Sequence, residues 1–256
     1  MKGIRLLHVF FISASIFLQS CGERESEEIT VAAAANMRFV MEDLTTLFTK
    51  ETGIICNLVI ASSGKLTAQI KEGAPYDIFI SADMKYPDFL YAQGLTTGPP
   101  QVYAYGKLVL WTAYHDQVPS MERLIDENVK HIAVAQTETA PYGRAALEAI
   151  KRKGYLEKIQ NKLVYAGSIS QVNHFVSSQS VDVGFTSLST VLSPDLHTLG
   201  SWAEVPDNLY EPIVQGLVLL KSKEGTVKKE TQKFYEYLST NTALSVVKKY
   251  GYITAL

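Results

Sequence analysis

From Ile29 onward, short apolar runs alternate with amphipathic stretches, and this alternation constrains the fold more than any other feature of the sequence. Residues 29–35 are typical of a buried strand, and residues 37–50 have the apolar spacing of a helix. A strand over 54–60, a helix over 65–71 and a strand over 77–81 continue the series. A repeated strand–helix–strand order favours a doubly wound α/β sheet.

Two β-rich segments, residues 105–111 and 210–220, interrupt this order. A second α/β set lies between them, with strands expected over 132–135, 162–166 and 181–185 and helices over 144–153 and 171–178. After the second segment the pattern predicts one long helical region over 227–250.

We interpret this arrangement as two α/β lobes joined where the chain crosses near residue 105 and returns near residue 212. The predicted domains are lobe one, residues 29–104 and 212–256, and lobe two, residues 105–211. A cleft between two such lobes is the usual place for a ligand.

The N-terminus has the features of an export signal. Lys2 and Arg5 precede an apolar run from Leu6 to Leu18, which is too short to span a bilayer comfortably. The run ends in Leu18-Gln-Ser-Cys21, which resembles the bacterial lipobox. That resemblance implies a signal peptide over 1–20, a lipidated Cys21 and a polar tether over 21–28, and so a protein of the periplasm anchored to a membrane. The alternative is an ordinary signal peptide with an incidental cysteine.

Composition and motifs exclude several classes of function. The formal net charge of the 256 residues is −2, which provides no basic field for nucleic acid. Two cysteines, Cys21 and Cys56, cannot build a disulfide framework or a zinc site, and Cys56 is expected to be a small buried hydrophobe. The five histidines are scattered, and the chain has no nucleophile elbow, Walker A loop or dinucleotide fingerprint. The sequence therefore indicates a protein that is not an enzyme.

Four strand-to-helix junctions are the candidate ligand site. Small and hydroxyl-bearing residues occupy all four, namely Ala35-Asn36, Ala61-Ser-Ser-Gly64, Thr139-Ala-Pro-Tyr-Gly143 and Gly167-Ser-Ile-Ser170. Asn36 is a favoured N-cap residue, and the first-turn N–H groups of a helix lack intrahelical partners and attract anions. None of the four junctions has a lysine or arginine at its centre; Lys65 and Arg144 each follow the glycine of their junction by one residue. Neutral donors of this kind suit a small, fully ionised oxyanion that must be released again.

Longer stretches around these junctions resemble the periplasmic molybdate-binding proteins of ABC importers. The matching stretches include Ile29-Thr-Val-Ala-Ala-Ala-Ala-Asn36, Ala61-Ser-Ser-Gly-Lys-Leu-Thr-Ala-Gln-Ile70, Gly73-Ala-Pro-Tyr-Asp-Ile-Phe-Ile-Ser-Ala-Asp83 and Ala140-Pro-Tyr-Gly143. The resemblance implies the type II periplasmic-binding-protein fold, with two doubly wound lobes, two crossover strands and the ligand cleft between them.

The same resemblance implies the ligand and its contacts. Molybdate or tungstate would be held only by hydrogen bonds, from Asn36 and Ser63 in lobe one and from the backbone of Tyr142 and Ile169 in lobe two, with Ala35 adding another. No cofactor and no direct metal ligand are expected, since molybdenum enters only as the oxyanion. The partners would be an ABC permease with its ATPase, and the protein would be a monomer that does not bind nucleic acid.

Three points stay open at this stage. The role of Ser187 is undecided, because one branch of the family has a ligand tyrosine there. The ligand could be another oxyanion such as sulfate or phosphate, while ferric ion would need more tyrosine and carboxylate oxygens. A sensory or adhesive lipoprotein that uses the fold without transport is the third alternative.

Overall fold

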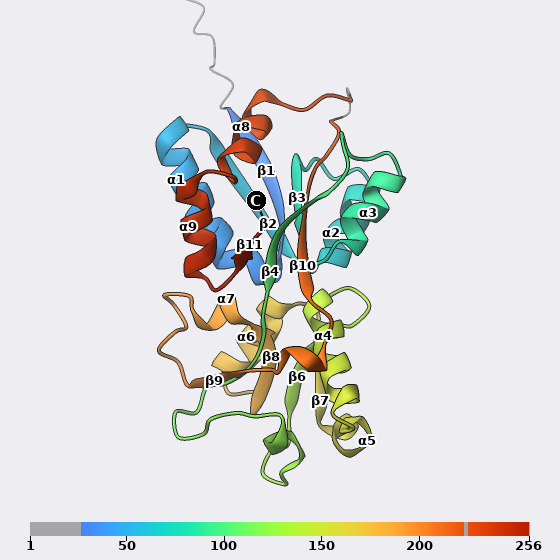
Figure 1. Cartoon of the computed structure of the whole chain (residues 1–256), viewed down its shortest axis with the longest axis vertical. Helices are drawn as coiled ribbons and strands as arrows, with labels where there is room; N and C mark the ends of the chain where they lie inside the picture. The colour runs from blue at the N-terminus through green and yellow to red at the C-terminus, as the bar shows by residue number, and fades with distance from the viewer. Residues whose placement is uncertain (1–26, 223–224, 256) are drawn as a thin grey trace, which may run out of the picture.

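A computed structural model of the chain describes residues 27–222 and 225–255. Within them the chain forms two β-sheets, each flanked by helices, which lie one above the other in Figure 1. The predicted signal peptide (1–20), Cys21 and most of the predicted tether (21–28) lie outside the described residues.

The first sheet contains the N-terminal strands and the C-terminal ones. Its strands are β1 (Glu28–Ala34), β2 (Ile55–Ala61), β3 (Ile78–Ser81), β4 (Gln101–Gly106), β10 (Ile213–Leu219) and β11 (Ile253–Thr254). Their order across the sheet is β11-β4-β10-β3-β1-β2. Because β1 is parallel to both β2 and β3, the carboxyl ends of these three strands meet at one edge of the sheet.

Helices cover both faces of this sheet (Figure 1). Their bounds are α1 (Arg38–Thr52), α2 (Ser63–Lys71), α3 (Lys85–Ala92), α8 (Lys229–Tyr237) and α9 (Asn241–Lys249). Apolar side chains of α1, α8 and α9 pack in one buried cluster with Val31 and Ile80, whereas α2 and α3 pack in another with Ala32 and Phe79. Alternate residues of the buried strands β1 and β3 therefore pack on opposite faces of the sheet.

The second sheet has the order β7-β6-β8-β5-β9. Its strands are β5 (Leu108–Thr112), β6 (Ile132–Ala135), β7 (Leu163–Ala166), β8 (Val183–Ser187) and β9 (Ser201–Glu204). The helices beside it are α4 (Pro141–Arg152), α5 (Leu156–Ile159), α6 (Ile169–Ser177) and α7 (Leu188–Val191). Short 3-10 turns complete the described chain: η1 (Ala35–Met37), η2 (Glu122–Ile125), η3 (Gln160–Lys162) and η4 (Asp207–Leu209). β6 is parallel to β7 and β8, so their carboxyl ends also share one edge.

The chain changes sheets at two places. β4 ends at Gly106 in the first sheet and β5 begins at Leu108 in the second, and the chain returns between Tyr210 and Ile213. We call residues 27–106 and 213–255 lobe one, and residues 108–210 lobe two. The α/β fold with two lobes is confirmed. The boundaries predicted at 104/105 and 211/212 stay a proposal, which the sheet membership of β4, β5 and β10 supports.

One expectation about secondary structure is wrong. The region 227–250 is not one helix but two: α8 ends at Tyr237, and Thr240 caps α9 with an extended backbone and an Oγ that accepts a hydrogen bond from the Ala243 N–H at 3.3 Å. The predicted β-rich segment 105–111 is strand on both sides of Lys107, where the chain passes from the first sheet to the second. No helix in the described part of the chain is long and apolar enough to cross a membrane.

Candidate functional site

The four predicted junctions meet at one small cavity between the lobes. About 200 Å³ of empty space, part of it open to solvent, lies between its lining atoms. The lining residues are Ala34, Ala35, Asn36, Ser62, Ser63, Ala82, Ala140, Pro141, Tyr142 and Ile169. All five residues predicted to bind the ligand are among them, so the cavity is the candidate site, and it is sized for a small solute.

The lobes are closed over this cavity. Each of the five predicted residues has at most 5% of its surface exposed. Ala34, Ala35 and Ala82 of lobe one belong to the same buried cluster as the apolar residues of lobe two. The buried residues of the two lobes therefore pack against each other around the cavity.

Ser63 is oriented as a hydrogen-bond donor toward a ligand. Its Oγ accepts a hydrogen bond from the Ala82 N–H at 3.0 Å, and within residues 27–222 and 225–255 it donates none. Its carbonyl oxygen accepts from the Thr67 hydroxyl at 2.8 Å, which fixes the first turn of α2. Because the Ala82 N–H donates to the Ser63 hydroxyl oxygen, the hydroxyl proton remains available to an acceptor in the cavity.

Asn36 is held by residues that the sequence analysis missed. Its amide nitrogen donates to Gln215 Oε1 and to Tyr252 Oη, both at 2.8 Å. Both amide hydrogens are therefore used within the protein, and Asn36 does not cap α1, whose N-cap residue is Met37. The expected N-cap role is wrong because Asn36 lies inside the 3-10 turn η1, one residue before the N-cap position of α1. The group of Asn36 that remains for an anion is its backbone N–H in η1.

Tyr142 and Ile169 come from the first turns of α4 and α6. Pro141 begins α4, and the Ser168 hydroxyl caps α6 by accepting from the Gln171 N–H at 3.3 Å. Helix starts of this kind leave N–H groups free to point at an anion. The Tyr142 phenol lies instead at the crossover, since a Cβ placed on Gly106 would come within 2.1 Å of its oxygen.

The cavity has no charged lining. None of the ten lining residues is acidic or basic, and Tyr142 is the only one that can ionise. Burial, and secondly the nearby Tyr252, raise the pKa of Tyr142 well above its ordinary value, so the phenol stays neutral. The described residues contain no group of three histidine, cysteine, aspartate or glutamate side chains that could hold a metal ion. The site offers an anion neutral donors and no carboxylate.

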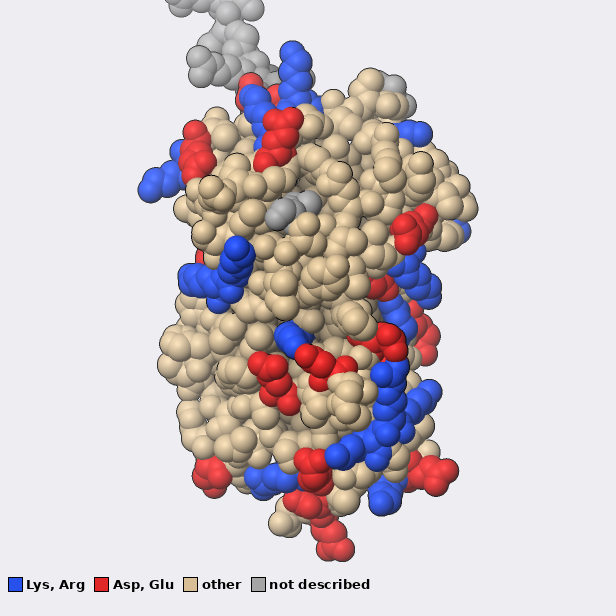
Figure 2. Space-filling view, viewed as in Figure 1, with Lys and Arg blue, Asp and Glu red and all other residues tan. Residues whose placement is uncertain are grey.

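Charges of both signs intermix on the molecular surface, with no large field of one sign on the face in Figure 2. Near the cavity, Arg144 forms an ion pair with Asp83 and does not line the site. Lys65 is exposed and extends toward Gly167 at the rim. The cationic residues at the junctions therefore lie around the cavity rather than in it.

Ser187 and Cys56 lie outside the candidate site. Ser187 is fully buried and shares hydrogen bonds with Ser189 at 2.8 Å and Thr190 at 3.0 Å, and it does not line the cavity. Cys56 is partly buried, and burial raises the pKa of its thiol to about 11, which keeps it protonated at neutral pH.

Comparison with known proteins gives consistent matches over the described chain. Residues 29–253 match the family described as bacterial extracellular solute-binding protein. The molybdate-binding proteins ModA of Azotobacter vinelandii and Rhodobacter capsulatus are 37% and 36% identical to it, over 89% of this chain and 90% and 88% of theirs. The solved structure of the Azotobacter vinelandii periplasmic molybdate-binding protein superimposes with a TM-score of 0.83 and 33% identity, over 89% of this chain and 100% of that one.

Proposed function

The chain belongs to the bacterial extracellular solute-binding protein family, and we propose that it captures molybdate or tungstate between its lobes for an ABC importer. As a binding protein it is not an enzyme, and its solute is a ligand rather than a cofactor. The observation that supports the ligand best is the convergence of Ala35, Asn36, Ser63, Tyr142 and Ile169 around one closed, uncharged cavity. The ModA relatives, at 36% and 37% identity, support the same ligand.

The donor set fits a dianion that has no proton of its own. Molybdate near neutral pH is a tetrahedral acceptor, and the proposed contacts are the Ser63 hydroxyl and the first-turn N–H groups at Ala35, Asn36, Tyr142 and Ile169. Hydrogen bonds to a charged group are each worth about 1.5–3 kcal/mol, so a few of them replace a formal counter-charge. Neutral donors also let the anion leave when the lobes open.

Sulfate is the second candidate, because it has the same charge, the same tetrahedral shape and no proton near neutral pH. The bonds from sulfur to oxygen are shorter than those from molybdenum to oxygen. In a cavity fitted to molybdate, every hydrogen bond to sulfate would therefore be longer. Phosphate keeps at least one proton near neutral pH, and the uncharged lining offers it no carboxylate acceptor.

The cellular setting follows from the proposed N-terminus and the family. We infer that Cys21 carries lipid after cleavage of residues 1–20, and that residues 21–28 tether the two lobes to a membrane on the periplasmic side. The closed monomer would then deliver its anion to an ABC permease with its ATPase. The solved relative described as periplasmic supports this location.

Small-angle scattering tests whether the lobes close on the ligand. We expect the radius of gyration to fall and the thermal unfolding temperature to rise when molybdate saturates the protein, because a ligand that binds only the native state stabilises it. An unchanged radius and an unchanged unfolding temperature at high molybdate concentration would contradict the proposal.

A further inference from the structure

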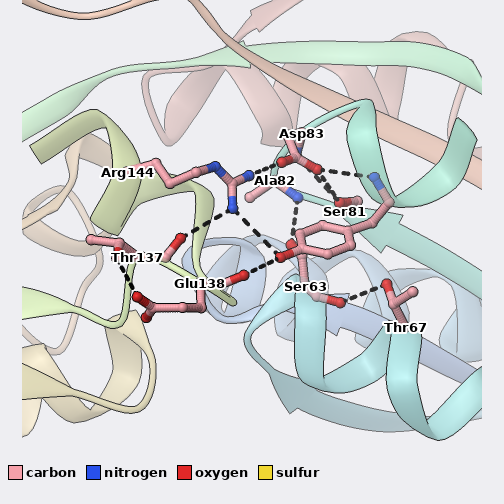
Figure 3. A network of polar contacts seen from close by, with 9 residues as sticks. Ser63, Thr67, Ser81, Ala82, Asp83, Thr137, Glu138 and Arg144 are labelled. Atoms are coloured by element: carbon pink, nitrogen blue, oxygen red, sulfur yellow. Dashed lines mark hydrogen bonds and ion pairs between the residues drawn. The ribbon is translucent and has the colours of Figure 1, made fainter. Parts of the chain in front are cut away.

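A second set of polar contacts joins the lobes beside the cavity, and Figure 3 shows it next to Ser63 and Ala82 of the proposed anion site. Asp83 and Tyr86 come from lobe one, at the end of β3 and the start of α3. Thr137, Glu138 and Arg144 come from lobe two, around the start of α4. Neither Asp83 nor Arg144 lines the cavity.

Arg144 is the centre of this set. Its Nη2 forms an ion pair with Asp83 Oδ2, and its Nη1 lies 3.5 Å from Tyr86 Oη and 3.4 Å from the Thr137 carbonyl oxygen. Its guanidinium carbon lies 5.6 Å from the centre of the Tyr86 ring. The Tyr86 hydroxyl in turn donates to the Glu138 carbonyl oxygen at 2.8 Å. One arginine of lobe two is thus held by two side chains of lobe one.

The ion pair between Arg144 and Asp83 is partly shielded from solvent. The side chains of Arg144 and Asp83 are 33% and 18% exposed, so both charges are partly removed from solvent. Burial raises the pKa of Asp83, and Arg144 is the strongest of the groups that oppose this rise. Asp83 is also fixed within lobe one, where its Oδ1 accepts from the Ser81 hydroxyl at 3.2 Å. Arg144 reaches Asp83 only across the gap between the lobes.

Separation of the lobes breaks each of these cross-lobe contacts, because each joins a residue of lobe one to a residue of lobe two. We propose that Asp83, Tyr86 and Arg144 form a latch that keeps the lobes closed and slows release of the bound oxyanion, an inference that rests on the proposed function. The three are positioning residues, since they hold the closed arrangement and do not touch the anion.

A latch and a simple effect of the electric field predict opposite changes in the release rate when the charge of Asp83 is removed. If only the electric field at the anion mattered, removing a nearby negative charge would slow release and removing Arg144 would speed it. If the pair is a latch, loss of either partner leaves the other partly buried and unpaired, and each single change speeds release. Asp83→Asn therefore separates the two explanations.

The experiment measures release of radiolabelled molybdate from preloaded protein during a chase with excess unlabelled molybdate. Asp83→Asn, Arg144→Gln and the double variant are compared with wild type. Lys153→Gln is the matched control, because Lys153 ends the same helix, is exposed to a similar degree and pairs with Glu122 within lobe two at 2.7 Å. Thermal unfolding without ligand shows whether each variant is folded.

We expect each single variant to release the anion about tenfold faster than wild type, with Lys153→Gln unchanged. The double variant should be no faster than the faster single variant, because both remove the same interaction. Release from Asp83→Asn at the wild-type rate or more slowly would overturn the latch, as would independent, multiplying effects in the double variant.

Two further measurements cover the cases in which a variant does not fold or a different anion binds. If Asp83→Asn does not fold, Arg144→Lys replaces it: a pure field effect predicts unchanged release, whereas a latch that needs the guanidinium fork predicts faster release. If wild type binds sulfate but neither molybdate nor tungstate, the proposed ligand is wrong, and the latch is tested by the same chase with labelled sulfate.

Discussion

The backbone N–H of Gly64 donates a hydrogen bond to the carbonyl oxygen of Thr139 at 2.8 Å, and this single bond joins α2 of lobe one to the loop before α4 of lobe two. It lies next to Ser63, so the closed lobes and the proposed donor are fixed together. Two backbones can come this close only if neither carries a bulky side chain at the contact. A Cβ on Gly64 would come within 2.8 Å of Thr139 Cα and 2.7 Å of Tyr86 Oη.

Gly64→Ala should therefore weaken molybdate binding without destabilising the unliganded protein. The Tyr86 phenol can rotate away, but the Thr139 backbone cannot, so full closure is obstructed. Alanine is better than glycine in a helix by up to about 1 kcal/mol, which acts in the opposite direction on the fold. We expect affinity measured by calorimetry to fall about tenfold or more, corresponding to about 1.4 kcal/mol. Gly98→Ala is the control, because nothing lies within 4 Å of its added Cβ. Equal affinity of Gly64→Ala and wild type would show that binding does not need this closed contact.

Ser63→Ala should reduce molybdate affinity by about 1.5–3 kcal/mol, the range for a hydrogen bond to a charged group. The change also removes the acceptor of the Ala82 N–H, so thermal unfolding of the unliganded variant has to be measured beside the binding isotherm. Ser245→Ala, which removes an exposed hydroxyl bonded within α9, should bind like wild type. An unaltered isotherm for Ser63→Ala would mean that the hydroxyl does not face the anion.

Molybdate affinity should be nearly independent of pH between roughly pH 7 and 9, where none of the lining groups titrates. Burial raises the pKa of Tyr252 to about 12 and that of Tyr142 well above its ordinary value. Both phenols therefore stay protonated through this window, and no negative charge forms beside the anion. Calorimetric titrations at several pH values check this. A steep loss of affinity toward pH 9 would reveal an ionising group in the site.

Replacing Cys21 should free the protein from the membrane, because a lipidated Cys21 is the proposed anchor. Cys21→Ser is expected in the soluble periplasmic fraction, and Cys56→Ser, which alters only the internal cysteine, in the membrane fraction with wild type. Fractionation followed by immunoblotting distinguishes the two. Membrane association of Cys21→Ser would contradict the proposed lipidation.

Local patterns in the sequence predicted the parts of the fold that depend on nearby residues. Apolar spacing predicted a buried strand over 29–35 and helices from residues 65, 144 and 171. In the structure the strand ends at Ala34, and the helices begin two or three residues earlier than predicted, at Ser63, Pro141 and Ile169. Because parallel strands of one sheet end at the same edge, the convergence of these junctions could also be anticipated.

Long-range partners were not predictable in this way. Gln215 and Tyr252 hold the Asn36 amide from 179 and 216 residues away, and nothing in the local pattern marks either of them. The ion pair between Asp83 and Arg144 exists only because the lobes close, so each residue alone resembles an ordinary surface charge. Resemblance to a family suggested the ligand contacts, but the hydrogen bonds that orient Ser63 and Asn36 required the structure.

The central claim is that the closed, uncharged cavity binds a fully ionised tetrahedral oxyanion, and calorimetric titration of the wild-type protein tests it most directly. Molybdate, tungstate, sulfate and phosphate are titrated in parallel at neutral pH. We predict that one molybdate binds per chain and that tungstate binds comparably. Phosphate should bind at least about tenfold more weakly than molybdate, since a buried unpaired donor costs about 1–3 kcal/mol. Absence of molybdate binding, or equal affinities for phosphate and molybdate, would contradict it.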